Sequence, residues 1–122
     1  MRISELFASG SPVYAAAPMI NQSDLAFRVL TRRYGATLTY TQMLHPDKLM
    51  HDQDYLEYHI LNMDPPGILE LAGPDGDHGY LHLGKPVVAQ VCGNDVQKIA
   101  EACKKFVGHC DAIGPFLRPR SM

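Results

Sequence analysis

Gln90 is the residue whose type and position most directly suggest ligand chemistry. It is the one polar side chain in the apolar run Pro86–Val91. Burying an amide without hydrogen-bond partners costs a few kcal/mol, so the side chain needs partners. A neutral amide both donates and accepts, which matches the alternating N–H and C=O groups along the edge of a flavin ring. Two interpretations stay open here: an amide that faces a ligand, or a core glutamine bonded to backbone.

A second candidate site is the stretch "AAAPMI", in which Ala15, Ala16 and Ala17 precede Pro18. Three small side chains leave room for a flat ligand against the backbone, or they accommodate a large neighbouring side chain. Pro18 cannot donate to a sheet ladder, so it marks the end of a strand. Asn94 is a third polar candidate, and a helix cap is the simpler role for it.

Metal and nucleotide-phosphate chemistry have no support in the sequence. The three cysteines, Cys92, Cys103 and Cys110, form no CxxC pair, and we expect plain thiols. His78 and His82 are separated by Gly79 in a Gly/Pro-rich stretch, which argues against a helix that would bring both onto one metal. "PDGDHG" lacks the glutamate that ends a calcium loop. Neither GxGxxG nor GxxxxGK[ST] occurs, so we expect no metal and no phosphate-binding glycine loop.

The elements that must position these residues alternate between strand and helix. Short strands are predicted over 13–17 and 37–41. Between them, Ser23 is the predicted N-cap of a helix that runs to about Tyr34 and ends at Gly35. A second, weaker helix is predicted over 45–58. Residues 62–83 are rich in glycine and proline and predict an irregular excursion.

The last unit, "KPVVAQVCGNDVQKIAEACKKFVG", has the clearest pattern. Pro86–Val91 predicts a strand covered on both faces. Asn94 and Gln97 resemble a capping box at the start of an amphipathic helix. A new strand then opens at 111–113 and is expected to stop at Ile113, because Gly114-Pro115 follows at once. The predicted buried face of the helix consists of Val96, Ile99, Ala100, Cys103, Phe106 and Val107.

Alternating strands and helices predict an α/β fold with a parallel sheet. The chain is too short for a closed (β/α)₈ TIM barrel, so we expect an incomplete one with about three βα units plus the start of a fourth strand. Ligands of such folds bind at the carboxyl ends of the strands. Here these ends are 18–24, 43–45 and 90–95.

Composition narrows the class further. The chain has 122 residues, 46% of them hydrophobic, which fits one globular domain. A net charge of −2 argues against a free-standing nucleic-acid binder. The first residues lack the apolar run of a signal peptide, and no stretch could span a membrane. Three cysteines without a CxxC pair fit a reducing compartment, so a cytoplasmic or nuclear location is expected.

Two stretches resemble the N-terminal half of a tRNA-dihydrouridine synthase: "APMINQSDLAFRVLTRRYGATLTYTQM" and "KPVVAQVCGNDVQKIAEACKKFVGHCDAI". The wording "NQSDLAFR" is most similar to the eukaryotic branch that acts on positions 16 and 17 of the tRNA D-loop. The resemblance implies a flavin-binding TIM barrel followed by a helical domain, with tRNA as the partner. It implies that Pro18, Met19 and Ile20 lie against FMN by their backbone, that Gln90 hydrogen-bonds the ring, and that Met43 lies nearby.

In the family, NADPH reduces FMN, the reduced flavin passes hydride to uridine C6, and a cysteine protonates C5. Family members continue after Asp-Ala-Ile with Asp-Leu-Asn-x-Gly-Cys-Pro, which supplies the asparagine that holds the uracil and the cysteine that protonates C5. This chain continues after Ile113 with "GPFLRPRSM" instead. No cysteine follows Ile113, so no catalytic residue is assigned. The resemblance therefore divides the chain into a barrel segment, 1–113, and a tail outside the family pattern, 114–122, as a retained intron, alternative exon or gene-model error would produce.

Three functions are compatible with these observations. The first is a flavin-dependent tRNA-dihydrouridine synthase represented by a truncated chain that is inactive alone. The second is a non-catalytic fragment that binds a partner protein or RNA through unpaired sheet edges. The third is an unrelated small α/β binding domain. A yellow protein with a flavin spectrum would favour the first function, and a colourless protein that co-purifies with a larger subunit would favour the second.

Overall fold

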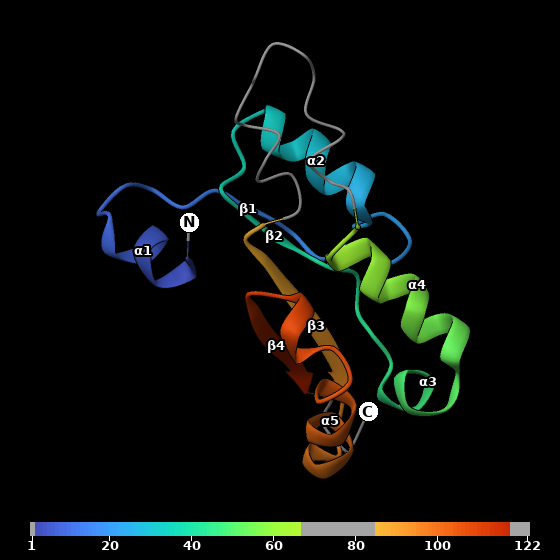
Figure 1. The fold of residues 1–122 in the computed structure, drawn as a ribbon. Helices are drawn as coiled ribbons and strands as arrows, with labels where there is room; N and C mark the ends of the chain where they lie inside the picture. The colour runs from blue at the N-terminus through green and yellow to red at the C-terminus, as the bar shows by residue number, and fades with distance from the viewer. Residues whose placement is uncertain (1, 67–84, 118–122) are drawn as a thin grey trace.

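The apolar runs of the sequence become neighbouring strands of one parallel sheet. The computed structural model describes residues 2–66 and 85–117, and Figure 1 shows their arrangement. The sheet order follows the chain, β1-β2-β3-β4, and every neighbouring pair is parallel. The predicted α/β fold with a parallel sheet is thus confirmed. The strands are β1 (Ala15–Ala16), β2 (Leu38–Tyr40), β3 (Val87–Gly93) and β4 (Ala112–Leu117).

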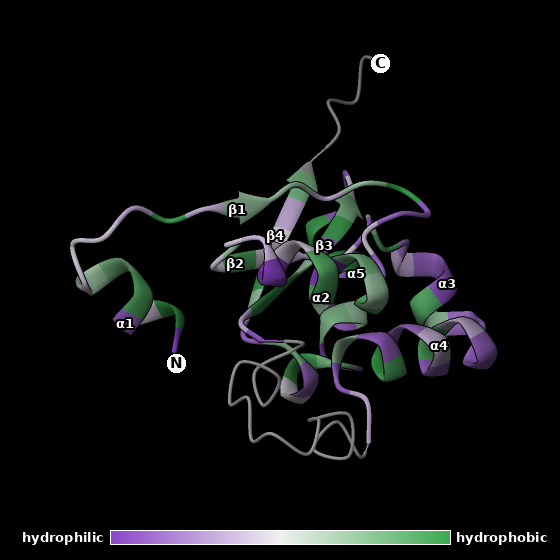
Figure 2. Ribbon diagram, turned by 90° about the horizontal axis from the view of Figure 1, so that it is seen from above, coloured by the Kyte–Doolittle hydropathy of each residue, from purple (hydrophilic) through white to green (hydrophobic). Residues whose placement is uncertain are grey.

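Helices cover the two faces of the sheet unequally. One face packs against the helices between β2 and β4, and its buried core includes Leu49, Met63, Val91 and Phe106. On the other face, Leu6 packs with Leu38 and Val88. Seen from above, α1 lies apart from the other helices (Figure 2). The helices are α1 (Ile3–Ala8), α2 (Leu25–Arg33), α3 (Pro46–His51), α4 (Gln53–Met63), α5 (Val96–Cys103) and the short 3₁₀ helix η3 (Val107–His109).

The helix predicted after the first strand is α2, but its N-cap is Asp24 rather than Ser23. The prediction was wrong because the Ser23 hydroxyl is buried in the preceding loop, where it bonds the backbone of that loop instead. At the other end, Gly35 follows the C-cap with a φ of +102°. This left-handed conformation favours glycine, so the predicted helix stop is confirmed.

The weaker helix predicted over 45–58 is two helices, α3 and α4. The break lies at Asp52, which has extended backbone angles (φ −121°, ψ 101°). Its carboxylate accepts a hydrogen bond from the Tyr55 N–H (3.0 Å), so this residue caps the second helix. A cap residue inside an otherwise helical pattern is what divides the segment.

The amphipathic helix α5 is confirmed, but its cap and part of its face differ from the prediction. Asp95, not Asn94, is the N-cap, and its carboxylate accepts from the Lys98 N–H (3.2 Å). Ile99, Ala102 and Phe106 are buried. Val96, Ala100 and Val107 were predicted to be buried but are exposed, because the helix ends at Cys103 and its contact stripe is rotated toward Ala102.

The strand expected to stop at Ile113 continues to Leu117. Its register with β3 runs from Val88↔Ala112 to Gly93↔Leu117, through Gly114 and Pro115. In the described residues β4 pairs with β3 alone. Proline is tolerated on an edge strand because its missing N–H can point away from the ladder.

The excursion predicted over 62–83 begins later than expected, since Asn62 and Met63 form the end of α4. Residues 67–84 lie outside the described part of the chain, and with them His78, His82 and the "PDGDHG" stretch. Within the described ranges, no helix combines the length and the apolar character that crossing a bilayer requires.

Candidate functional site at the carboxyl ends of the strands

The loop after β1 is held in a defined shape by Ser23, whose side chain is 1% exposed. Its Oγ accepts a hydrogen bond from the Met19 N–H (2.7 Å) and donates to the Ala17 carbonyl (3.0 Å). The Ser23 N–H donates to the Met19 carbonyl (3.0 Å), which closes the turn. Pro18, Met19 and Ile20 therefore lie in a tight loop at the carboxyl end of β1.

Arg28 connects this loop to the end of α4. The side chain is 1% exposed and donates to the Ser23 carbonyl (3.0 Å) and to the Asn62 carbonyl at the end of α4. Burial lowers the pKa of Arg28 to about 10, and nearby Asp24 opposes the shift. The guanidinium remains charged at neutral pH, so its two hydrogen bonds are charge-assisted and tie the loop to α4.

Gln90 lies near the carboxyl end of β3, on the face opposite the main core. Its neighbours Ala89 and Val91 pack into that core, and side chains alternate along a strand, so Gln90 shares the other face with Val88. Its main chain is fully bonded, because its N–H donates to Thr41 Oγ1 (3.0 Å) and its carbonyl accepts from the Leu44 N–H (2.8 Å). The side-chain amide is half-buried and has no intramolecular partner within residues 2–66 and 85–117. This amide is available to a ligand.

The four residues predicted to contact a cofactor thus lie at the carboxyl ends of two strands, β1 and β3. One strand, β2, separates them, so two strand spacings of about 4.8 Å each set their separation across the sheet, about 10 Å. A planar ligand of flavin size could span that gap. The role of Pro18, Met19, Ile20 and Gln90 stays a prediction.

A cysteine–histidine pair lies beside this site and was not predicted. Cys92 Sγ is 3.5 Å from His45 Nδ1, and both residues line a cavity of about 350 Å³ together with Met43 and Lys98. His45 precedes α3, and its N–H donates to the Tyr55 hydroxyl (3.1 Å). At this distance the thiol and the imidazole can share a hydrogen bond. No signal in the sequence indicated this pair, because His45 and Cys92 are far apart in the chain. His45 is recognisable in the sequence only as the residue before Pro46, at the start of α3.

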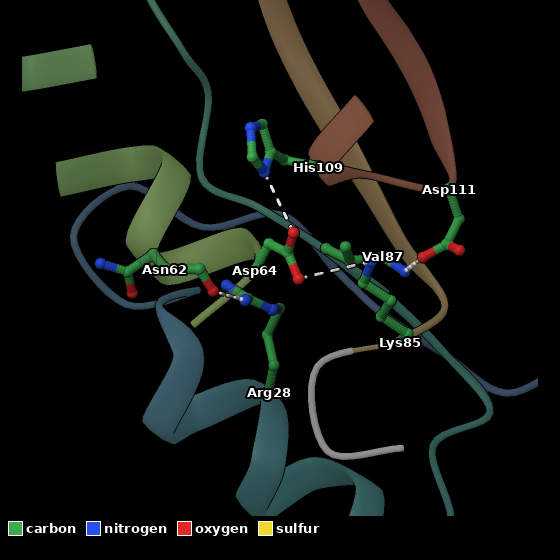
Figure 3. Close-up of polar contacts among 7 residues, drawn as sticks. All are labelled: Arg28, Asn62, Asp64, Lys85, Val87, His109 and Asp111. Atoms are coloured by element: carbon green, nitrogen blue, oxygen red, sulfur yellow. Dashed lines mark hydrogen bonds and ion pairs between the residues drawn. The ribbon is translucent and has the colours of Figure 1, made fainter. Parts of the chain in front are cut away.

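The opposite end of the sheet carries a polar cluster that also escaped sequence reasoning (Figure 3). Asp64 lies 3.0 Å from His109 Nδ1 and 3.7 Å from Lys85 Nζ. Asp111 accepts from the Val87 N–H (2.8 Å). These contacts join α4 to the starts of β3 and β4, which is a structural role, because ligands of parallel α/β folds bind at the other end.

The cysteines form no disulfide with one another. Burial raises the pKa of the Cys103 and Cys110 thiols. In the described part of the chain, no group of three or more His, Cys, Asp or Glu side chains is placed to hold a metal ion.

These features define a parallel α/β protein whose candidate ligand site lies at the carboxyl ends of its strands. The family model described as dihydrouridine synthase (Dus) matches residues 15–114. The chain therefore belongs to the dihydrouridine synthase family.

Curated relatives agree with this assignment. The chain is 36% identical over 104 residues to the tRNA-dihydrouridine(16/17) synthase [NAD(P)(+)] of Saccharomyces cerevisiae, which covers 85% of this chain and 21% of that protein. It is 32% identical over 106 residues to a tRNA-dihydrouridine(16/17) synthase-like protein of Rattus norvegicus, covering 87% and 20%. A human tRNA-dihydrouridine(20a/20b) synthase-like protein is 50% identical over 40 residues, covering 33% and 13%. The chain spans about a fifth of the length of the 16/17 relatives. No solved structure matches it significantly.

Proposed function

We propose that this chain is the flavin-contacting part of a tRNA-dihydrouridine synthase, with FMN held between the Pro18–Ile20 loop and Gln90. The observation that carries the proposal is the half-buried Gln90 amide, which lies at the carboxyl end of β3 without an intramolecular partner in the described residues. A ligand that offers both a donor and an acceptor would satisfy it.

The donor set of the site fits such a group. The tight loop after β1 presents backbone rather than charged side chains at 18–20. The alanines of β1 leave its surface flat. A bound FMN would supply hydride transfer to the uracil ring of a tRNA uridine, with NADPH as the reductant. The residues of this chain would bind and orient the ring, and a reducing compartment such as the cytosol or nucleus would fit the three thiols.

The chain follows the barrel pattern of this family only in part. The four parallel strands in chain order support a partial TIM barrel over 1–113, with 114–122 departing from the family pattern. In β4, Phe116 lies opposite Cys92, at the position where the family pattern carries the asparagine that holds the uracil. This departure supports a chain that does not reduce uridine by itself.

The test is FMN binding by the 122-residue chain, measured by the quenching of flavin fluorescence. Gln90→Leu keeps the side-chain volume and removes both hydrogen-bonding groups, so it should weaken FMN binding by about tenfold. Gln53→Leu makes the same change on the exposed surface of α4 and should leave binding unchanged. Equal affinities for the unchanged chain and Gln90→Leu would contradict the assignment of Gln90.

A second candidate function is a non-catalytic fragment that pairs with a partner protein. It is favoured by the two outer strands: in the described residues, β1 pairs with β2 alone and β4 with β3 alone. Unpaired strand edges are templates for pairing with another chain. A colourless protein that co-purifies with a larger subunit would favour this function over flavin binding.

A further inference from the structure

The carboxylate of Asp24 does not cap the helix that it precedes. Asp24 is the N-cap of α2, yet its side chain makes no capping hydrogen bond to that helix. An aspartate at this position ordinarily stabilises a helix by accepting from one of its first N–H groups. Asn62 Oδ1 instead accepts from the first helical N–H, that of Leu25 (3.0 Å). The Asp24 carboxylate is thereby left for other partners.

Those partners come from two other elements. Asp24 Oδ1 accepts from Gln42 Nε2 (2.9 Å), just after β2, and Oδ2 accepts from the Tyr58 hydroxyl (2.7 Å) on α4. The hydrogen bond to Asp24 raises the pKa of Tyr58, whose phenol is a donor at neutral pH. Both carboxylate oxygens are thus occupied by side chains that lie far from Asp24 in the sequence.

Gln42 also contacts the loop itself. Its Oε1 accepts from the Asn21 N–H (3.1 Å), so one amide links both ends of the turn between Asn21 and Asp24. Asn21 has a φ of +58°, in the left-handed region that non-glycine residues seldom occupy. Such a conformation is unfavourable for a non-glycine residue and persists where neighbouring contacts hold it.

Asn21 directly follows Met19 and Ile20, the residues proposed to lie against the cofactor. Resting on the proposed function, we propose that Asp24, Gln42 and Tyr58 are positioning residues that fix the Pro18–Asp24 loop in its flavin-contacting conformation before flavin binds. A loop ordered in advance loses less conformational freedom on binding, and the ligand binds more tightly for that reason.

The decisive variants exchange the two groups of the Asp24–Gln42 contact. Gln42→Glu alone places two carboxylates side by side and should weaken FMN binding about tenfold. The double variant, Gln42→Glu with Asp24→Asn, restores the contact with its two groups exchanged. The amide now at position 24 can donate to the carboxylate now at position 42, and its oxygen can still accept from the Tyr58 hydroxyl. The carboxylate can also accept from the Asn21 N–H. The double variant should therefore bind FMN within about threefold of the unchanged chain, a loss of only a fraction of one hydrogen bond.

Tyr58→Phe is the milder variant, since Tyr58 is half exposed and the ring is kept. It should weaken FMN binding by a smaller factor than Gln42→Glu does. Gln53→Leu removes an exposed hydrogen bond to Glu57 on the same helix and serves as the matched control. The control should leave both flavin affinity and loop exchange unchanged.

Hydrogen exchange without flavin tests the loop independently of the cofactor. The Asn21 N–H should exchange at least about tenfold faster in Gln42→Glu than in the unchanged chain, and the reversed pair should slow it again. Unaltered exchange at Asn21 would overturn the inference whether or not the chain binds FMN. Accelerated exchange with unaltered FMN affinity would also overturn it, because the loop would then be held without consequence for the ligand. A chain that shows the exchange pattern but binds no FMN in any form would overturn the proposed function, and with it the flavin role of this network.

Discussion

At the scale of the residue, Gly93 shows where backbone geometry demands glycine. It ends β3 with a φ of +152°, and a Cβ there would lie 3.3 Å from Ile99 Cδ1. Gly93→Ala should therefore destabilise the fold by about 1–3 kcal/mol, through backbone strain and contact with the first turn of α5. Urea unfolding measures the change.

Gly108→Ala is the control for this substitution. A Cβ added at Gly108 would meet no atom within 4 Å, and the residue has no positive φ, so alanine should change stability by less than about 0.5 kcal/mol there. Equal losses at the two glycines would show that the geometry of Gly93 is not the cause.

At the scale of the element, α4 carries a buried histidine that makes the fold sensitive to pH. His59 is 5% exposed and lies edge-on to Tyr55 and Tyr58, with ring centroids 4.3 and 5.0 Å away. Burial lowers the pKa of His59; Asp24 opposes the shift, and His45 and Lys48 add to it. The folded chain therefore favours neutral His59, and the unfolded chain takes up the proton at higher pH.

The sign follows from proton linkage. Because the unfolded state binds more protons below the ordinary histidine pKa of about 6.5, stability from His59 is present above that pH and is lost as the pH falls. His59→Phe keeps an aromatic ring and should flatten the decline in unfolding free energy between about pH 7.5 and 5. The exposed His51→Gln serves as the comparison and should keep the decline. A decline of the same slope in His59→Phe would contradict this origin.

The elements also show which parts of the fold the sequence could predict. Apolar runs such as 86–91 identified the strands, because a strand in a parallel sheet is buried on both faces. The caps were less predictable: Ser23, Asp24, Asn94 and Asp95 are all good cap residues, and tertiary contacts decide among them.

The same reason explains what was missed in the site. Gln90 stood out locally, as a polar residue in an apolar run. Gln42 and His45 did not, because each acts through a partner distant in sequence, Asp24 and Cys92 respectively. A polar network of this kind has no periodic signature, so only the folded chain reveals it.

At the scale of the whole molecule, exposed apolar side chains gather beside an outer strand. A groove of about 460 Å³ runs along β1 and α2 and is lined by Tyr14, Leu30 and Tyr34, which are 62%, 50% and 87% exposed. Exposed apolar surface next to an unpaired strand favours association. We expect the chain to self-associate with rising concentration, as light scattering after size exclusion would show.

Leu30→Lys tests the contribution of the groove and should shift the chain toward monomer. Val96→Lys makes a similar change at an exposed position of α5, outside the groove, and should have a smaller effect. A monodisperse monomer with a sharp cooperative melt in the unchanged chain would contradict the prediction.

The whole molecule also decides whether these 122 residues can carry out the reaction of the family. Hydride delivery to uridine C6 leaves carbanion character at C5, and a positioned general acid typically accelerates protonation about 10²- to 10⁴-fold. Within these 122 residues no cysteine follows Ile113, and Cys103 at the end of α5 and Cys110 before β4 both lie away from the carboxyl ends of the strands. Cys92 lies on β3, whereas the family pattern places the acid after β4. Phe116 offers no amide to hold the base.

We therefore expect no dihydrouridine when the 122-residue chain is incubated with FMN, NADPH and unmodified tRNA. Holding the flipped-out base in position lowers the barrier further, by up to about 7–11 kcal/mol. The loss of the acid and the loss of this positioning are independent of each other. Mass spectrometry of the tRNA measures the product, beside an extended chain in which the family sequence follows Ile113. Because the extended chain regains both the acid and the groups that orient the base, it should form dihydrouridine. Comparable rates from the two chains would show that a residue before Ile113 protonates C5. The first residue to replace by serine would then be Cys92, which lies beside His45.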